Sequence, residues 1–418
     1  MSEQFRKSGS EQNLLNLGWI DLDGKFVFIE KIVRTVPYGF LGVVFGIYMA
    51  QLGFSPALIG IVLTITVFTS AVYTFGISFV ADRFGRKRTL IIFALMDAVA
   101  GSFLFLSTAW WAPVIAGIVG NMTVGAGEVG PFLSLEQAII PKTCDQKHRT
   151  LAFSVYNLAG YGASSIGALL AGLPQYFGSG IIGYRPLFAA YMLSGLAGSI
   201  LYSRLSKNVE IGEAVVKKRA VLSERSKPIV RKLAGLFAID AFGGGFIGQS
   251  ILAYYFYLRF GLSNTALGLV FFTTQIITAF SFLAAERIAR RLGLLNTMVF
   301  THIPSNIFLT LVPFAPSATG AVALLFCRQS LSQMDVPTRQ SYVMAVVDDA
   351  DRTPAAGLTN VSRSLSQSVS PSLAGFSMAS IWIGAPLFVA GILKLIYDAL
   401  IYGNFRKIKP PEEQKQIG

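Results

Sequence analysis

Two stretches of the chain carry polar and ionisable side chains on one face of otherwise apolar predicted helices. At about 100° per residue, the first face spans roughly 80° and the second roughly 60°. The two faces consist of Asn121, Gly125, Glu128 and Glu136, and of Arg328, Ser332, Asp335 and Arg339. Because a charge at the centre of a bilayer costs at least about 2.5 kcal/mol, each face should line a cavity or meet a partner.

Three carboxylates are candidates for carrying protons. Glu128 and Asp240 lead, because a carboxyl group removed from water can bind and release a proton as its access to solvent alternates. Asp335 is the third, although Arg328 and Arg339 lie seven residues before and four residues after it and could neutralise it locally. The alternative for each carboxylate is a permanently paired structural charge.

A further set of residues is expected to form the wall of a substrate cavity. Its arginines would suit an anionic group, since a guanidinium can pair with carboxylate or phosphate through two hydrogen bonds. Its tyrosines would add aromatic surface. The set comprises Asn121, Glu136, Arg328, Arg339, Arg363, Tyr38 and Tyr254.

The remaining ionisable residues near apolar stretches are interpreted as structural. Glu30 and Arg34 stand at the expected edge of the first span and should snorkel into water. Asp97 should pack within its own half of the molecule. Lys394 and Asp398 are spaced i, i+4 and are expected to pair with each other.

The composition requires a membrane protein. Hydrophobic residues make up 53% of the 418 residues and charged residues only 14%, against roughly 25% charged in soluble domains. Spans of about 20 apolar residues cross a bilayer, and twelve can be placed. Their approximate centres are Gly42, Val67, Ala98, Val124, Gly162, Gly195, Gly245, Thr278, Phe308, Ser332, Leu365 and Val389. No cleavable signal segment is expected, because the first 25 residues are polar.

The distribution of Lys and Arg predicts the topology. Of 35 such residues, 29 fall in the two tails and the even-numbered connections, and only Arg185 and Arg259 fall in the odd-numbered ones. This asymmetry places both termini in the cytoplasm. The net charge of +13 therefore reflects orientation in a membrane, and nucleic acid is not an expected partner.

The sequence repeats itself. Residues 53–62, GFSPALIGIV, return as GLSNTALGLV at residues 261–270, 208 positions later. A second match, 203 positions apart, aligns Gly172 with Gly375. Weak internal symmetry of this kind is typical of transporters built from two equivalent halves.

The sequence offers little for an enzyme or a cofactor. Cys144 and Cys327 are too few and too far apart for a disulfide framework or a metal site, and His148 and His302 add no ligand spacing. No nucleophile–base arrangement or nucleotide motif is present. We therefore expect no enzymatic activity, no cofactor and no ATP-driven pumping.

The turn after the second span resembles a family signature. ADRFGRKRTL, residues 81–90, is similar to the loop between helices 2 and 3 of the major facilitator superfamily, and ARRLGLLNT from Ala289 resembles its degenerate second copy. Two departures are Ser78, where the family usually has Gly, and Arg290, where the first copy has Asp82. The spans and the repeat extend the resemblance over essentially the whole chain, with bacterial or archaeal multidrug or metabolite exporters as the most similar type.

The resemblance implies an all-α membrane fold of twelve transmembrane helices in two pseudo-symmetric six-helix bundles. In this family helices 1, 4, 7 and 10 line a central cavity, so the two polar faces should oppose each other. Glu136 and Arg339 are equivalent in the repeat and opposite in charge. We therefore expect them to form an ion pair between the halves.

The signature loop is interpreted as a latch that stabilises one arrangement of the halves. Gly85 permits a tight reversal, and Asp82 can accept hydrogen bonds from the start of a neighbouring helix. Arg83, Arg86 and Lys87 would pair with acidic groups or lipid phosphates. The alternative is that these charges only anchor the topology.

The expected organisation has five parts. Two bundles are flanked by polar tails and joined by a mixed-charge linker. The parts are a tail at 1–26, a bundle at 27–205, the linker at 206–232, a bundle at 233–403 and a tail at 404–418.

The predicted function is secondary active transport of a small organic molecule in the cell membrane, by a monomer that alternates access across the lipid bilayer. Proton-coupled efflux is favoured, because residues 167–172, GALLAG, partly match the helix-5 motif of drug antiporters in this family. That match lacks the motif's proline. The alternatives are a proton-coupled uptake symporter for a sugar, organic acid or inorganic anion, and a membrane receptor that binds without transport.

Overall fold

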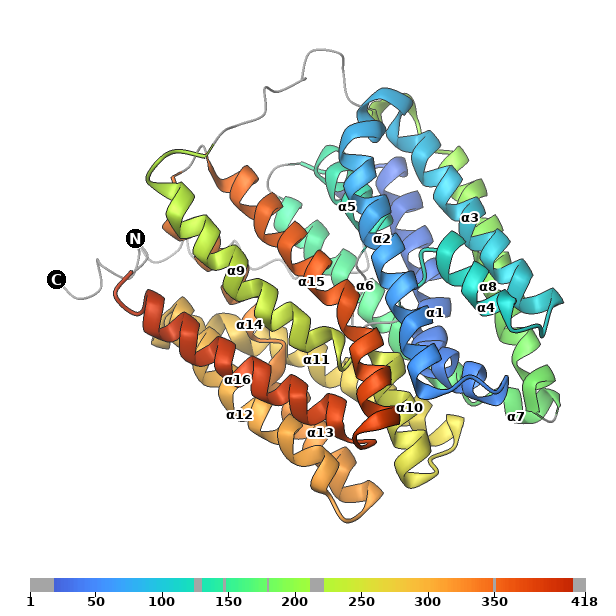
Figure 1. The fold of residues 1–418 in the computed structure, drawn as a ribbon. Coiled ribbons are helices and arrows are strands. Elements are labelled where there is room, and N and C mark those ends of the chain that lie inside the picture. The colour runs from blue at the N-terminus through green and yellow to red at the C-terminus, as the bar shows by residue number, and fades with distance from the viewer. Residues whose placement is uncertain are drawn as a thin grey trace, which may run out of the picture.

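The chain forms two bundles of helices joined by a linker (Figure 1). The computed structural model describes residues 19–123, 130–145, 148–178, 180–210, 222–348 and 351–408. No strand occurs in these ranges, and one isolated bridge joins Ile20 to Cys144. The predicted all-α membrane fold is confirmed.

The first half runs to residue 205. Its helices are α1 (Leu22–Gln51), α2 (Pro56–Phe84), α3 (Arg86–Leu106), α4 (Trp111–Val119), α5 (Pro131–Ile139), α6 (Arg149–Leu170), α7 (Pro174–Phe177) and α8 (Arg185–Ser203). Short 3-10 turns follow α5, precede α8 and begin the linker at Ile140–Lys142, Gly180–Tyr184 and Lys207–Val209.

The second half begins at Ser226. Its helices are α9 (Ser226–Gly245), α10 (Gln249–Phe260), α11 (Asn264–Leu292), α12 (Leu294–Leu311), α13 (Ala318–Ser332), α14 (Asp335–Val346), α15 (Arg352–Ser380) and α16 (Ala385–Phe405). A 3-10 turn at Val312–Phe314 follows α12.

Small residues shape the ends and breaks of these helices. Ser263 and Ser317 cap α11 and α13 by accepting backbone hydrogen bonds through their side chains. Gly130, with a φ of 143°, lies one residue before α5. Its repeat equivalent, Gln333, lies two residues before α14. These two positions are 203 residues apart, so the helix boundaries follow the internal repeat.

Eight helical segments of the described chain are long and apolar enough to cross a membrane. The other four predicted spans, centred near Val124, Gly162, Ser332 and Leu365, are interrupted or rich in small polar residues. The count of twelve therefore stays a prediction.

The two ends of the molecule differ in how the halves meet. We call the end that carries residues 205, 226 and 408 the linker face and the opposite end the distal face. Toward the distal face, one cluster of buried apolar side chains includes Tyr48 from the first half and Tyr255 from the second. Toward the linker face, each half has an apolar cluster of its own. The halves are thus joined at the distal face and separately packed at the linker face.

Three helix pairs make most of the contact between the halves. They are α2 with α15, α6 with α11 and α1 with α10. Figure 1 shows α15 beside α2, and α10 near the lower end of α1, at the ends remote from the linker. The described inter-half hydrogen bonds involve the distal or middle parts of these helices.

Candidate functional site

A closed polar network lies inside the first half. Arg34 of α1 binds Glu136 of α5 at 2.7 Å and Glu30 at 3.1 Å. The Tyr202 hydroxyl donates to both glutamates, and the Tyr156 hydroxyl donates to Glu136. All three charged side chains are at least 96% buried. Each carboxylate is thus held by a cation and by neutral donors.

The expectation that Glu30 and Arg34 snorkel into water is wrong. The first helix begins at Leu22, about ten residues before the edge expected from hydropathy. At 1.5 Å per residue, these side chains lie roughly 12 and 18 Å inside the helix. A buried charge at that depth needs a partner, which Glu136 supplies.

Asp97 of α3 forms a second polar centre in the first half. It accepts hydrogen bonds from the hydroxyls of Tyr38 at 2.8 Å and Tyr191 at 2.9 Å, and from the backbone N–H of Asn121 at 2.7 Å. The expected packing of Asp97 within its own half is confirmed. Tyr38 therefore directs its hydroxyl to Asp97, whereas the buried side-chain amide of Asn121 has no hydrogen-bond partner among the described residues.

Asp240 of α9 is the hub of the second half. Its carboxylate lies 2.6 Å from Lys394 of α16, 2.8 Å from Arg363 of α15 and 3.4 Å from Arg339 of α14. His302 of α12 is 3.9 Å away. One carboxylate thus holds together side chains from four other helices.

Arg339 pairs within its own half. It binds Asp335 at 2.6 Å as well as Asp240. Of the two arginines that could neutralise Asp335 locally, Arg339 therefore does so, whereas no ion pair with Arg328 is formed among the described residues. The expected ion pair between Glu136 and Arg339 is not formed, because each residue is neutralised by partners in its own half.

The sequence interpretation missed a buried group built on His302. Its Nδ1 lies 2.7 Å from Asp398, and Asn306 Nδ2 donates to the same carboxylate at 2.8 Å. Asp398 was expected to pair with Lys394, which instead binds Asp240. The available signal was the i, i+4 spacing of His302 and Asn306 on one face of α12.

Arg328 of α13 differs from the other cations of the second half. Its Nη1 donates to Gln329 Oε1 at 3.0 Å, and Gln329 in turn donates to Thr278 at 2.6 Å. Its Nε is buried and finds no partner in the part of the chain that the structure describes, and the same holds for the Ser332 hydroxyl one turn later. No described carboxylate forms an ion pair with it.

One cavity candidate, Tyr254, and one proton-coupling candidate, Glu128, lie outside these networks. Tyr254 is 4% exposed and packs in the distal apolar cluster that joins the halves. Glu128, with Gly125, lies outside the described residues, so its role stays a prediction. The described chain holds no group of three metal-ligating side chains.

The signature loop contacts the linker. Gly85 has a φ of 93°, which makes the tight reversal before α3. The Glu210 carboxylate accepts from the backbone N–H groups of Arg86 at 2.6 Å and Lys87 at 3.2 Å. Glu210 thus caps α3, the role expected of Asp82. The side chains of Asp82 and Arg83 lie outside the described residues.

Further contacts fix the linker's start. The Lys87 ammonium donates to the Leu205 carbonyl, and the Arg86 guanidinium donates to the Ala138 carbonyl. The Lys142 ammonium donates to the Glu210 carbonyl at 2.6 Å. Desolvation, together with the nearby Arg86 charge, lowers the pKa of Lys142. The basic residues of this loop therefore bind carbonyl groups of their own half.

The linker's end binds the second half in a similar way. The Ser223 hydroxyl donates to Asp351 at 2.5 Å and to Asp348 at 3.0 Å, and Arg225 lies 3.4 Å from Asp348. Each end of the linker is thus attached to a different bundle.

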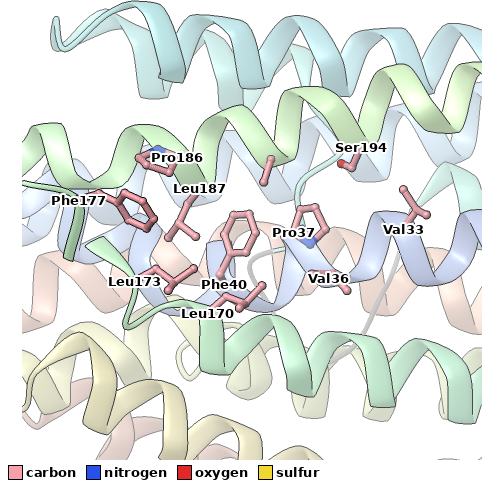
Figure 2. Close-up of a pocket in the computed structure, with 11 residues that line it drawn as sticks. Val33, Val36, Pro37, Phe40, Leu170, Leu173, Phe177, Pro186, Leu187 and Ser194 are labelled. Atoms are coloured by element: carbon pink, nitrogen blue, oxygen red, sulfur yellow. The ribbon is translucent and has the colours of Figure 1, made fainter. Parts of the chain in front are cut away.

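A separate cavity of about 230 Å³ lies within the first half, between α1, α6 and α8. Figure 2 shows its apolar lining, with Phe40, Leu173 and Leu187 around the hollow and Ser194 at one end. None of its lining residues is ionisable. It is therefore distinct from the polar networks.

Comparisons with known proteins agree with this architecture. Residues 31–371 match the sequence model of the Major Facilitator Superfamily. An uncharacterised membrane protein of Saccharomyces cerevisiae, YJR124C, is 23% identical over 91% of this chain and 93% of its own length.

Solved transporter structures share the fold. The nucleoside transporter NupG has a TM-score of 0.72 at 14% identity, covering 92% of this chain and 100% of its own. A D-xylose–proton symporter has a TM-score of 0.71 at 13% identity, covering 90% and 97%. An inward-facing, occupied bacterial homologue of the human lysosomal transporter Spinster has 0.70 at 15%, covering 92% and 96%.

Proposed function

The chain belongs to the major facilitator superfamily, and on that premise we propose that it is a secondary active transporter that moves a small organic molecule by alternating access. It is a multi-pass membrane protein with the fold of non-enzymatic solute transporters. The proposal for this chain is that its two bundles rock about a binding site between them.

The observation that carries this proposal is a pair of symmetric contacts at the distal face. A Cβ on Gly60 of α2 would lie 2.4 Å from the carbonyl oxygen of Pro371 in α15. A Cβ on Gly268 of α11 would lie 2.5 Å from the carbonyl oxygen of Ala168 in α6. Gly60 and Gly268 are 208 residues apart, and Ala168 and Pro371 are 203 apart, so the two contacts are repeat equivalents.

Backbones approach this closely only where both sides are small. The contacts join the halves at the distal face, whereas the apolar clusters near the linker face are separate. This arrangement supports a closed distal gate in a carrier whose binding site opens toward the linker. With the predicted topology, that side is the cytoplasm.

We further propose proton coupling, with export favoured over uptake as in the sequence analysis. Glu128, Asp335 and Asp240 remain the proton-coupling candidates. Asp240 could exchange a proton only when its ion pairs with Lys394 and Arg363 open, which requires movement of α9 relative to α15 or α16. The buried carboxylates are what supports coupling.

The test is flux in proteoliposomes that contain an internal pH-sensitive dye, with a panel of cationic drugs, organic anions and sugars. The wild type is compared with Glu128→Gln and Asp240→Asn. Proton movement that accompanies substrate flux in the wild type and vanishes in either variant supports coupled transport. The direction of proton movement relative to substrate flux separates export from uptake. Substrate flux without proton movement would remove the carboxylate assignments and leave the carrier.

The gate is tested with Gly60→Leu and Gly268→Leu. Both should reduce flux by at least about tenfold, since a shift of 1.4 kcal/mol between conformations already changes their ratio tenfold. Gly76→Leu in α2 is the matched control, because a Cβ there meets nothing within 4 Å. A ligand that stabilises the wild type but is never transported would instead support a receptor.

A further inference from the structure

Arg328 is a buried cation without a matching carboxylate. Only 7% of the residue is exposed. Its Nη1 donates to the neutral amide of Gln329, and its Nε has no partner within the described ranges of the chain. Asp240 and Asp335 interact with it electrostatically, yet neither forms an ion pair with it among the described residues.

The described charges nearby explain why none of Asp240, Asp335 and Asp398 is free for Arg328. Arg339 occupies Asp335, and Lys394 and Arg363 occupy Asp240. The third carboxylate, Asp398, is held by His302 and Asn306. Among the described residues, three cationic side chains thus share the two carboxylates Asp240 and Asp335, and Arg328 is a fourth cation that pairs with neither.

An unpaired buried ion costs several kcal/mol. The same helix face adds a second unsatisfied donor, because the Ser332 hydroxyl is buried without a partner four residues after Arg328. A guanidinium and a hydroxyl on adjacent turns form a site for an oxyanion, which can accept from both. Gln329, fixed by Thr278 of α11, holds the guanidinium in place.

Accessible positive charge is also present on α15, the helix that meets α2 of the other half. The Arg363 side chain is 23% exposed and donates to Asp240 at 2.8 Å. A second acidic group on a ligand could share this guanidinium with Asp240. The second half therefore carries cationic groups toward the proposed path of the substrate.

Resting on the proposed transport function, we propose that the substrate is a small organic anion whose carboxylate or phosphate binds Arg328 and Ser332. Arg328 is then the residue that selects negative charge. The bound anion would supply the counter-charge that no described carboxylate gives Arg328 through an ion pair.

The first experiment measures the thermal midpoint of the purified protein with matched probes. Succinate, succinamide and putrescine share a four-carbon chain and differ in charge, and glucose 6-phosphate is paired with glucose. We expect succinate or glucose 6-phosphate to stabilise the wild type, whereas the neutral and cationic counterparts do not. Which of the two stabilises it distinguishes carboxylate from phosphate recognition.

The same titration in Arg328→Met should raise the dissociation constant of that anion roughly 10- to 150-fold, the range for a hydrogen-bonded charge. The dissociation constant for Arg328→Lys should lie between those of the wild type and Arg328→Met. Lysine keeps the positive charge but loses the planar set of N–H donors of the guanidinium. Stabilisation by succinamide, glucose or putrescine alone would overturn the anion assignment, and so would an unchanged constant in Arg328→Met. Flux of that neutral or cationic compound would still uphold the transporter.

The ligand-free protein provides an independent test. Removing a surplus buried charge should raise the thermal midpoint of Arg328→Met, whereas Arg339→Met should lower it by leaving Asp335 unpaired. Arg225→Met, on a side chain that is 83% exposed, should change nothing. If Arg328→Met loses as much stability as Arg339→Met, Arg328 is structural and the inference fails.

Discussion

The two halves bury similar numbers of charges but neutralise them differently. In the described spans of the first half, Arg34 lies between two glutamates, and the Tyr202 hydroxyl is within hydrogen-bond distance of both. In the second half, Asp240 pairs with three cations, one of which also binds Asp335, while Arg328 forms no ion pair with a described carboxylate. A network whose charges are paired by its own residues stabilises the fold, whereas a network with an unpaired charge can respond to a ligand.

The comparison also separates the contacts between the halves from the charge networks within each half. The distal glycine contacts obey the internal repeat, but the charge networks do not. Alternating access needs the halves to move as equivalent bodies, whereas recognition needs a site that one half can dominate. The contacts at the distal gate are therefore expected to be alike in the two halves, whereas the charge networks are expected to differ.

The largest effect is expected for Asp240→Asn. It leaves Lys394, Arg363 and Arg339 with one carboxylate fewer in a buried site, so the free energy of unfolding should fall by about 3–5 kcal/mol. Chemical unfolding in detergent measures this. Asp97→Asn is the counterpart in the first half, where all donors to the carboxylate are neutral, and it should cost only about 1–2 kcal/mol. Equal losses would contradict the contrast between the halves.

A smaller loss is expected for Glu136→Gln. The amide still accepts from Tyr156 and Tyr202, and Arg34 keeps Glu30 as its counter-ion. The unfolding free energy should fall by about 1–3 kcal/mol. Transport, measured in the same proteoliposomes, should keep its substrate preference, because this network belongs to the support. A changed preference would place Glu136 in the substrate path.

Sequence reasoning located the polar positions but not their partners. The repeated segments at residues 53–62 and 261–270 were recognisable because a repeat is a local pattern, and their equivalent glycines, Gly60 and Gly268, lie at the contact between the halves. Glu136 was assigned to Arg339 because symmetry suggested it. The actual partner, Arg34, is 102 residues away in the chain, and only the packing of α5 against its own half brings the two together.

The early start of α1 explains the wrong expectation for Glu30 and Arg34. Hydropathy marks where a chain becomes apolar, whereas α1 begins earlier, at the Asp21 cap. Charged residues near the start of a helix can therefore be buried by neighbouring helices. His302 and Asp398 escaped notice for a related reason, because their partnership joins α12 and α16 across 96 residues.

A modest effect is expected at the distal gate from Tyr184→Phe. The Tyr184 hydroxyl accepts from Asn264 of the other half at 2.9 Å and from Gln51 at 3.1 Å. Losing it should weaken the closed gate by about 0.5–1.5 kcal/mol, roughly a two- to tenfold change in the ratio of conformations. Labelling of Thr64→Cys by a membrane-impermeant thiol reagent, applied from the distal side, measures that ratio. Unchanged labelling would mean that the hydrogen bonds of the Tyr184 hydroxyl do not help to hold the gate closed.

The smallest effect concerns the linker's attachment to the second half. The Ser223 hydroxyl, followed by Ser226, lowers the pKa of the Asp351 carboxyl by hydrogen bonding. A carboxyl whose pKa is lower in the folded state adds stability that is fully present above its unfolded pKa of about 3.9. That stability is lost as pH falls through the folded value. Ser223→Ala should therefore lower the thermal midpoint at pH 6, and its curve should converge with the wild type below about pH 4. In an Asp351→Asn background the serine substitution should leave no pH-dependent difference, and curves that stay parallel in the wild-type background would assign the serine's effect to a group other than Asp351.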